Sequence, residues 1–267
     1  MLYIVATPIG NLEDITLRAL RIFGEVEMIA AEDTRRTIKL LNHYDIKTKL
    51  VSFHEHSDAG KRAWLIDILK EGRDIALVSD AGTPLISDPG AVLVKEAVQA
   101  GVEITSLPGA CAAITALTLS GHGGAFTFVG FFGKKSSERK AQMACVAKSD
   151  VPCVIYESPH ALKKTLKTLA ETCGGERGVV VAKELTKMHE RVYWGTLGEA
   201  STFFEDPVKG EFVLIVAANE HKEEVSDEQI KAMIDGHIAQ GMTKKDAAGA
   251  ASRELGIRPN RAYRLTL

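Results

Sequence analysis

The sequence predicts an α/β protein made of two α/β domains with a ligand cleft between them and a small helical module near the C-terminal end. Short apolar runs alternate with amphipathic helical patterns along most of the 267 residues. Loops rich in Gly and Pro follow several of these runs, and the last segment combines helical periodicity with an excess of Lys and Arg. We expect the domains at 1–120 and 121–219 and the basic module at 226–267.

The first domain is predicted to hold a mostly parallel sheet, because helical patterns separate its apolar runs. The expected strands are 2–6, 26–31, 50–53, 75–78 and 102–107. The expected helices include segments around 37–43, 91–100 and 110–119. The sequence Gly-His-Gly-Gly at 121–124 is the best candidate for a linker.

The second domain repeats the alternation of strands and helices. The expected strands are 126–131, 153–157, 179–184, 191–194 and 212–217, with helices around 138–148 and 161–172. The run at 191–194 follows its predecessor too closely for a helical crossover, so we expect antiparallel pairing there.

The C-terminal segment is typical of a helix, a turn and a helix, at 245–255, Gly256 and 259–265. Residues 241–267 contain six Lys or Arg and two Asp or Glu, a local balance of +4. Two interpretations stay open: a module that binds nucleic acid, or a solvated helical cap.

Composition limits the possible functions. Apolar residues make up 45% of the chain and the net charge is −2, so nucleic-acid binding would need a local basic patch. The four cysteines form no CxxC pair, which indicates reduced thiols in a cytoplasmic protein. The chain enters a strand at once, and we expect neither a signal peptide nor a membrane span.

The loop at 79–90 is the most informative segment. It follows a buried apolar run and precedes a helical pattern, which is where ligands bind in an open α/β sheet. It contains two Asp and no Lys or Arg, whereas a phosphate loop normally supplies a cation. The loop therefore favours a ligand with hydroxyls or positive charge, such as S-adenosylmethionine.

The run at 32–36 also closes a strand. Asp33 or Thr34 could cap a helix, which the spacing favours, or Arg35 and Arg36 could contact phosphate at the mouth of the cleft. The sequence His-Glu-His at 54–56 lacks a visible third ligand, so we predict no metal site.

Two polar runs, at 156–160 and 183–187, end strands of the second domain. Each run could be ordinary loop polarity, with Ser158 as a helix cap before Pro159. Alternatively, the two runs could form the second wall of the cleft, where a carboxylate could orient or deprotonate an acceptor hydroxyl.

Together these segments resemble the tetrapyrrole methylase superfamily, and more narrowly its ribosomal branch. The resemblance rests on 7–11, 31–35, 79–84, 88–90, 107–113, 156–158 and 184–187, and covers nearly the whole chain. Ala110 stands where the branch usually has Pro. The resemblance implies two α/β domains of tetrapyrrole-methylase type, a homodimer, and 2′-O-methylation of a cytidine in the decoding region of small-subunit ribosomal RNA, with the RNA or the 30S particle as partner.

The resemblance also implies the residues that contact the cofactor, S-adenosylmethionine. They are Pro8, Asp80, Ala81, Gly82, Leu85, Cys111 and Ala112, joined by Glu157 and Leu185 from the second domain. For proton transfer from the acceptor hydroxyl, the candidates are Glu184, Glu157 and Asp33. The candidate RNA contacts are Arg35, Arg36, Lys183, Lys187, Lys244, Lys245, Arg258 and Arg261.

Two alternatives stay open. A methyltransferase of the same fold could act on a tetrapyrrole precursor, although the basic C-terminal segment has no purpose there. A non-catalytic nucleic-acid binder could use the helical tail alone, although it would not need the set of cleft loops.

Overall fold

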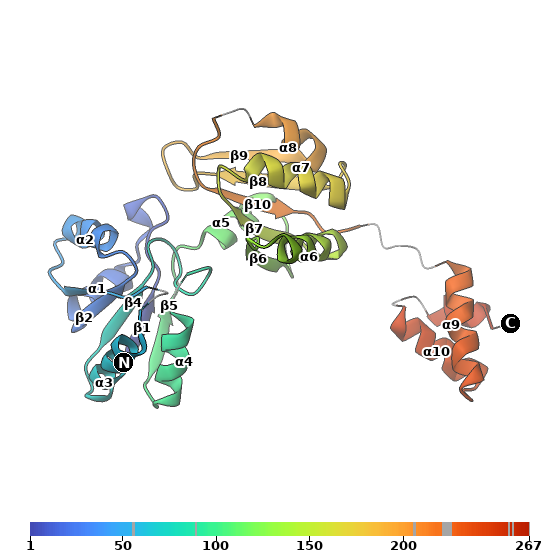
Figure 1. Ribbon diagram of the computed structural model, residues 1–267, viewed down its shortest axis with the longest axis horizontal. Coiled ribbons are helices and arrows are strands. Elements are labelled where there is room, and N and C mark those ends of the chain that lie inside the picture. The colour runs from blue at the N-terminus through green and yellow to red at the C-terminus, as the bar shows by residue number, and fades with distance from the viewer. Residues whose placement is uncertain are drawn as a thin grey trace. The chain divides into compact units, whose positions relative to one another are not determined.

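A computed structural model describes residues 1–54, 57–88, 90–204, 207–220, 226–255, 257 and 259–266 (Figure 1). The chain divides into two compact units, Met1–Asn219 and Glu220–Leu267. The first unit contains two five-stranded sheets, and the second contains helices. The two units are described separately below.

The first sheet is entirely parallel, as its sequence predicts. Its strands are β1 (Leu2–Val5), β2 (Met28–Ala31), β3 (Lys49–Ser52), β4 (Ile75–Val78) and β5 (Ile104–Leu107), in the order β3-β2-β4-β1-β5. β1 therefore lies between β4 and β5, which brings together the loops that follow these three strands although they are far apart in sequence.

Helices cover both faces of this sheet because alternate strand residues point to opposite sides. The helices α1 (Leu17–Glu25) and α2 (Thr34–His43) pack on one face, after a short 3-10 turn at Leu12–Asp14. The helices α3 (Ala59–Lys70) and α4 (Ala91–Gln99) pack on the other. Phe23 is completely buried, and a side chain of this kind contributes about 1.5–3 kcal/mol.

The second sheet is mixed. Its strands are β6 (Thr127–Phe131), β7 (Cys153–Glu157), β8 (Gly178–Lys183), β9 (Arg191–Thr196) and β10 (Phe212–Val216), in the order β6-β7-β10-β8-β9. Only the β6–β7 pair is parallel among the described pairings. The antiparallel pairing predicted for 191–194 is confirmed.

The helices α6 (Ser136–Lys148), α7 (Leu162–Cys173) and α8 (Leu197–Phe203) lie on one face of the second sheet. The helix α5 (Ala112–Ser120) packs on the opposite face, although it precedes the predicted linker at 121–124. The sequence patterns did not indicate α8. The alternative in which Ser158 caps a helix is wrong: α7 begins at Leu162 with Ala161 as its N-cap, and the Ser158 N–H donates to Glu157.

The C-terminal unit contains α9 (Asp227–Ala239), α10 (Lys244–Glu254) and α11 (Pro259–Arg264). The predicted helix, turn and helix correspond to α10 and α11, and α9 is an addition. A small core holds the three helices together, formed mainly by Ile230, Ile234, Ala247, Ala251 and Ala262. None of the helices in the described part of the chain has both the length and the apolar character needed to cross a bilayer.

Candidate cofactor and active site

The turns after β1 and β4 join each other at the carboxyl edge of the first sheet. The Thr7 N–H donates to the Gly82 carbonyl oxygen at 2.9 Å, and the Gly82 N–H donates to the Thr7 carbonyl at 2.8 Å. Gly82 has φ +80°, and a Cβ there would lie 3.2 Å from Ile9 Cγ2. Both the backbone conformation and the close approach explain why glycine stands at this position.

The turn after β1 also lies against the loop after β8 in the second domain. A Cβ on Gly10 would collide with the Lys187 side chain, and Ile9 packs in the same apolar cluster as Leu185. The loop after β4 contains two non-glycine residues with left-handed backbone, Leu85 at φ +74° and Ser87 at φ +69°. Such conformations cost about 1–3 kcal/mol each and occur mainly at functional sites.

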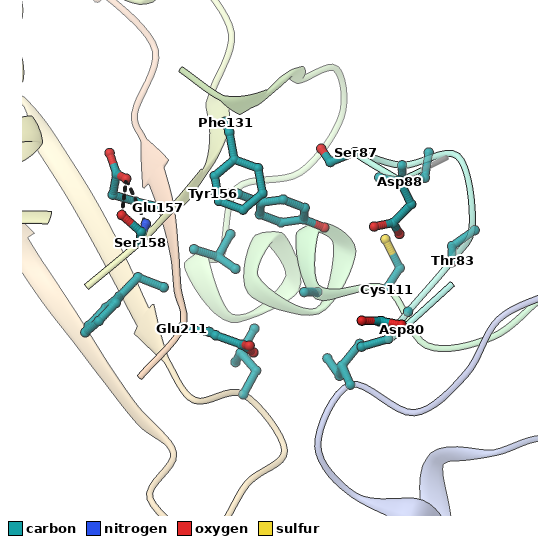
Figure 2. A pocket seen from close by; sticks show the side chains of 18 of the residues that line it. Asp80, Thr83, Ser87, Asp88, Cys111, Phe131, Tyr156, Glu157, Ser158 and Glu211 are labelled. Atoms are coloured by element: carbon teal, nitrogen blue, oxygen red, sulfur yellow. Dashed lines mark hydrogen bonds between the residues drawn. The ribbon is translucent and has the colours of Figure 1, made fainter. Parts of the chain in front are cut away.

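A cavity of about 350 Å³ lies beside these loops (Figure 2). Both domains contribute to its lining: the loop after β4, the start of α5, the end of β7, the loop after β8 and the start of β10. The lining residues are Ile9, Arg36, Asp80, Ala81, Gly82, Thr83, Ile86, Ser87, Asp88, Cys111, Ala112, Phe131, Tyr156, Glu157, Ser158, Pro159, Leu185, Glu211, Phe212 and Val213. A cavity of this size accommodates a small-molecule cofactor.

Most of the residues that the sequence predicted as cofactor contacts lie around this cavity. Those lining it are Asp80, Ala81, Gly82, Cys111, Ala112, Glu157 and Leu185. Pro8 instead lines a smaller neighbouring pocket, which shares Arg36 and Asp80 with the main cavity. Among the described residues, Leu85 is outside the lining, and its side chain lies beside Gly90. Direct contact of all nine residues with the cofactor stays a prediction.

Asp80 connects the loop after β4 to the run after β2. Its Oδ1 accepts a hydrogen bond from the Asp33 N–H at 2.9 Å, and its Oδ2 lies 3.4 Å from Arg36 Nε. Nearby, burial raises the pKa of Glu32, and the Asp80 carboxylate adds to that shift. The first sheet therefore presents a fixed acidic edge to the cavity, with Arg36 as its cation.

Asp88 is a second carboxylate in the cavity lining, and sequence analysis did not single it out as a catalytic candidate. Its pKa is raised to about 6, mainly by burial; a hydrogen bond with Ser79 opposes this shift, and the neighbouring Glu32 and Asp80 carboxylates add to it. A carboxyl group with this pKa can exchange a proton near neutral pH. The only signal in the sequence was that the loop contains a second Asp.

Tyr156 connects the second sheet to the start of α5. Its hydroxyl oxygen accepts a hydrogen bond from the Ala113 N–H at 3.2 Å, and burial raises the pKa of its phenol to about 12. The ring meets Phe128 and Phe131 edge to face. In Figure 2 the Tyr156 hydroxyl points toward the side of the cavity that carries Cys111 and Asp88. The phenol thus stays neutral and fixes the start of α5 against the second sheet.

The three predicted proton acceptors are not brought together. Glu157 is buried, and its carboxylate accepts hydrogen bonds from the Ser158 N–H at 2.7 Å and from the Thr165 hydroxyl, with Arg139 at 3.7 Å (Figure 2). Its acceptor positions are therefore largely used by α6, α7 and its own loop. Sequence patterns cannot reveal these partners of the Glu157 carboxylate, because they lie on helices that pack against the strand in the folded protein.

Glu184 and Asp33 are each held in an ion pair. Glu184 Oε1 lies 2.8 Å from Lys187 Nζ, and this hydrogen bond lowers the Glu184 pKa. Asp33 caps α2 and pairs with Arg35, which lowers its pKa to about 2. Neither residue is among the described residues that line the cavity. Both carboxylates are weaker bases than Asp88.

The predicted RNA contacts fall in separate places. Arg36 lines the cavity, and exposed Arg35 pairs with Asp33. Lys183 and Lys187 lie near the end of β8.

The remaining predicted RNA contacts belong to the C-terminal unit. There Lys244 donates to the Thr266 carbonyl and Arg261 pairs with Asp227, while Lys245 is exposed. Arg258 is outside the described residues.

The fold and cavity match a known class of protein. A family model described as tetrapyrrole (corrin/porphyrin) methylases matches residues 1–201. The solved structure of uroporphyrin-III-C-methyltransferase from Thermus thermophilus has a TM-score of 0.59 at 20% identity, over 81% of this chain and 93% of that chain. The methyltransferase CobJ gives a TM-score of 0.61 at 19% identity, over 81% and 93%. These likenesses show a tetrapyrrole methylase fold.

Curated relatives match nearly the whole chain. Proteins named ribosomal RNA small subunit methyltransferase I share 44% identity in Haemophilus influenzae, over 100% of this chain and 96% of that protein, and 42% in Bacillus subtilis, over 98% and 92%. A third, from Halalkalibacterium halodurans, shares 45% over 99% and 93%. The chain therefore belongs to the tetrapyrrole methylases and, within them, to the ribosomal RNA small subunit methyltransferase I family.

Proposed function

We propose that this protein transfers a methyl group from S-adenosylmethionine to the 2′-hydroxyl of a cytidine ribose in the decoding region of small-subunit ribosomal RNA. The observation that carries the proposal is the similarity, over nearly the full length, to relatives named for methylation of that RNA. The cavity adds a physical reason, because residues from both domains surround a space of cofactor size.

The residues present fit S-adenosylmethionine. Asp80 and Asp88 offer carboxylates to hydroxyl and cationic groups, and small side chains at Ala81, Gly82 and Ala112 leave room beside the backbone. A solved form of the Thermus thermophilus uroporphyrin-III C-methyltransferase, 15% identical with a TM-score of 0.58, is complexed with S-adenosylhomocysteine. When bound, S-adenosylmethionine supplies an electrophilic methyl group on its sulfonium sulfur.

The chain's own residues would orient the reactants and exclude water. Phe212, Val213 and Leu185 form an apolar wall on the second domain, opposite the acidic loop after β4. Holding an acceptor oxygen in line with the transferred group can lower the barrier by roughly 7–11 kcal/mol in the best intramolecular cases. Arg36, at the edge of the cavity, would pair with an RNA phosphate.

A ribose hydroxyl is a poor nucleophile, so a proton acceptor should assist it. Asp88 is a carboxylate of the lining with a pKa of about 6, close to neutral pH. We therefore assign the acceptance of the hydroxyl proton to the Asp88 carboxylate. Glu157, Glu184 and Asp33 become positioning residues in this mechanism, since their carboxylates are already bound.

Radiolabelled methyl transfer tests this proposal. The protein should label small ribosomal subunits or their RNA, and nuclease digestion with mass spectrometry should place the methyl on a cytidine ribose. Tetrapyrrole intermediates should stay unlabelled. Labelling of a base, or of a tetrapyrrole alone, would contradict the proposal.

The proposal extends to the assembly and location of the protein. We infer a cytoplasmic homodimer that acts on ribosomal RNA or the 30S particle. The resemblance to the ribosomal branch implies the dimer and the RNA partner, and the four cysteines without a CxxC pair favour the cytoplasm. Analytical ultracentrifugation of the purified chain tests the dimer, and a sedimentation coefficient of a monomer at micromolar concentration would contradict it.

A further inference from the structure

A second, larger concavity of about 1040 Å³ lies on the second domain, where β8 ends and β9 begins. We call it the β8–β9 basin. Its described lining is Val181, Lys183, Glu184, His189, Arg191, Val192, Tyr193, Phe203, Phe204, Pro207, Val208, Lys209, Gly210 and Phe212. The methyl transfer proposed above places no reactant in this basin.

The β8–β9 basin contains three cations. Lys183 and Arg191 are direct cross-strand partners on antiparallel β8 and β9, and Lys209 lies in the same lining. None of the three forms an ion pair with a described residue, and the Lys183 ammonium lies 5.9 Å from the centre of the Phe212 ring. Like charges directly opposite each other destabilise a sheet. An anion bound between them would remove that repulsion.

The same basin exposes an aromatic surface. The Phe203 side chain is 59% exposed, and its ring lies against Tyr193 with the ring centres 4.6 Å apart. Phe204 continues the aromatic cluster behind it. Exposed aromatic rings beside cations are the features that bind single-stranded nucleic acid, because bases stack on the rings while phosphates meet the cations.

The β8–β9 basin shares a wall with the cofactor cavity. Phe212 lines both spaces. The Lys187 ammonium bridges them, at 2.8 Å from Glu184 Oε1 on the basin side and 2.9 Å from Glu211 Oε2 on the cavity side. An RNA strand whose acceptor ribose lies at the cavity can therefore place its neighbouring nucleotides in the basin.

We infer that the β8–β9 basin binds the single-stranded RNA next to the acceptor nucleotide, with bases on Phe203 and Tyr193 and phosphates on Lys183, Arg191 and Lys209. This inference rests on the proposed function, since it presumes an RNA substrate. It assigns the basic residues of β8 and β9 a role separate from that of the C-terminal unit.

The test uses the full-length protein and a fluorescein-labelled single-stranded RNA oligonucleotide of mixed sequence. In fluorescence anisotropy, Arg191→Glu and Lys209→Glu should each weaken binding about tenfold. Each should also make the negative slope of log affinity against log salt shallower by about 1. Phe203→Ala should weaken binding with an unchanged salt slope. S-adenosylmethionine affinity, measured by calorimetry, should stay within about twofold in all variants, because none of these residues lines the cavity.

Matched controls separate a specific basin from general charge. Lys167→Glu on exposed α7 reverses the same charge outside the basin, and Leu17→Ala removes an exposed apolar side chain from α1. Both controls should bind RNA like the wild type. Equal weakening by Lys167→Glu, or unchanged RNA affinity in Arg191→Glu and Lys209→Glu, would overturn the inference.

Two further outcomes distinguish this inference from the proposed function. If the variants lose affinity for small ribosomal subunits but keep affinity for the RNA oligonucleotide, the basin binds a protein and the inference fails. If wild-type protein neither binds RNA nor methylates subunits, the proposed function fails and the inference fails with it. If the wild-type protein methylates subunits and the variants bind RNA as the wild type does, the inference about the basin fails while the proposed function stands.

Discussion

The protonation of Asp88 decides how the proposed chemistry depends on pH. Its pKa, raised to about 6 by burial, leaves the carboxyl mostly protonated below pH 6 and ionised above it. Methyl transfer should therefore rise with pH through about 6 and level off above it. Asp88→Asn should lower the rate by about 10²–10⁴-fold and abolish this rise. Single-turnover rates between pH 5 and 8 measure both effects.

Stability supplies the control for that variant. Because the Asp88 pKa lies above its ordinary value of 3.8, the folded protein favours the neutral form and loses stability as pH rises through about 6. The amide introduced by Asp88→Asn mimics the neutral carboxyl, so urea unfolding at pH 8 should show no loss of stability in this variant. Full activity in a folded Asp88→Asn protein would exclude Asp88 as the proton acceptor.

Asp80 has a different role, in which it holds the edge of the cavity. Its carboxylate binds the Asp33 N–H and lies beside Arg36 while it lines the cofactor space. Asp80→Ala should weaken S-adenosylmethionine binding about tenfold, as expected for a lost charged hydrogen bond. Calorimetry should show no change for the matched control Asp67→Ala, because Asp67 lies on the exposed face of α3 and outside the cavity lining. If Asp80→Ala bound S-adenosylmethionine as tightly as the wild type, Asp80 would be excluded as a cofactor contact.

At the scale of elements, the bridge between the turns after β1 and β4 is the joint that shapes the site. Gly82→Ala adds a side chain at φ +80°, where it meets Ile9 at 3.2 Å. We expect about 1–2 kcal/mol of destabilisation and weaker cofactor binding. Gly123→Ala is the matched control, because nothing lies within 4 Å of its Cβ. Urea unfolding compares the two, and an equal effect would show that the joint tolerates a side chain.

The strands were predictable because continuous apolar runs such as β4 and β10 form only in the interior of a sheet. The helix α8 escaped prediction because it has seven residues, too few to show a period. The helix α9 had a signal that was overlooked: Ser226 and Gln229 form a capping box.

The loops of the site were predictable from their positions at strand ends, but the carboxylate to which we assign proton acceptance, Asp88, was not. The strand order places β1 between β4 and β5, which joins residues about 75 positions apart. Thr165 and Arg139 occupy the Glu157 carboxylate, which was predicted as a proton acceptor. Burial instead raises the pKa of Asp88 to about 6, a value that suits proton acceptance. Both effects arise from tertiary packing, which sequence periodicity does not encode.

At the scale of the whole molecule, the described residues that line the cavity belong to the unit Met1–Asn219, which holds the proposed domains at 1–120 and 121–219, and the unit Glu220–Leu267 is described by itself. In that unit Arg261 is paired with Asp227 and Lys244 with a carbonyl oxygen. Two of its predicted RNA contacts are therefore partly occupied in holding its own fold together. Lys245 and Arg264 are exposed and form no ion pair with a described residue, so we expect them to meet RNA.

Deletion of 226–267 should consequently weaken RNA binding without weakening S-adenosylmethionine binding. S-adenosylmethionine affinity should stay within about twofold by calorimetry, since the described lining of the cavity belongs to the unit Met1–Asn219. RNA affinity should fall. The negative slope of log RNA affinity against log salt should become shallower by about 2, because the contacts of Lys245 and Arg264 are lost. The full-length variant Lys245→Ala/Arg264→Ala should reproduce the smaller slope while keeping the helices intact. An unchanged slope in both proteins would make the C-terminal unit a helical cap and leave RNA binding to Arg36 and the β8–β9 basin.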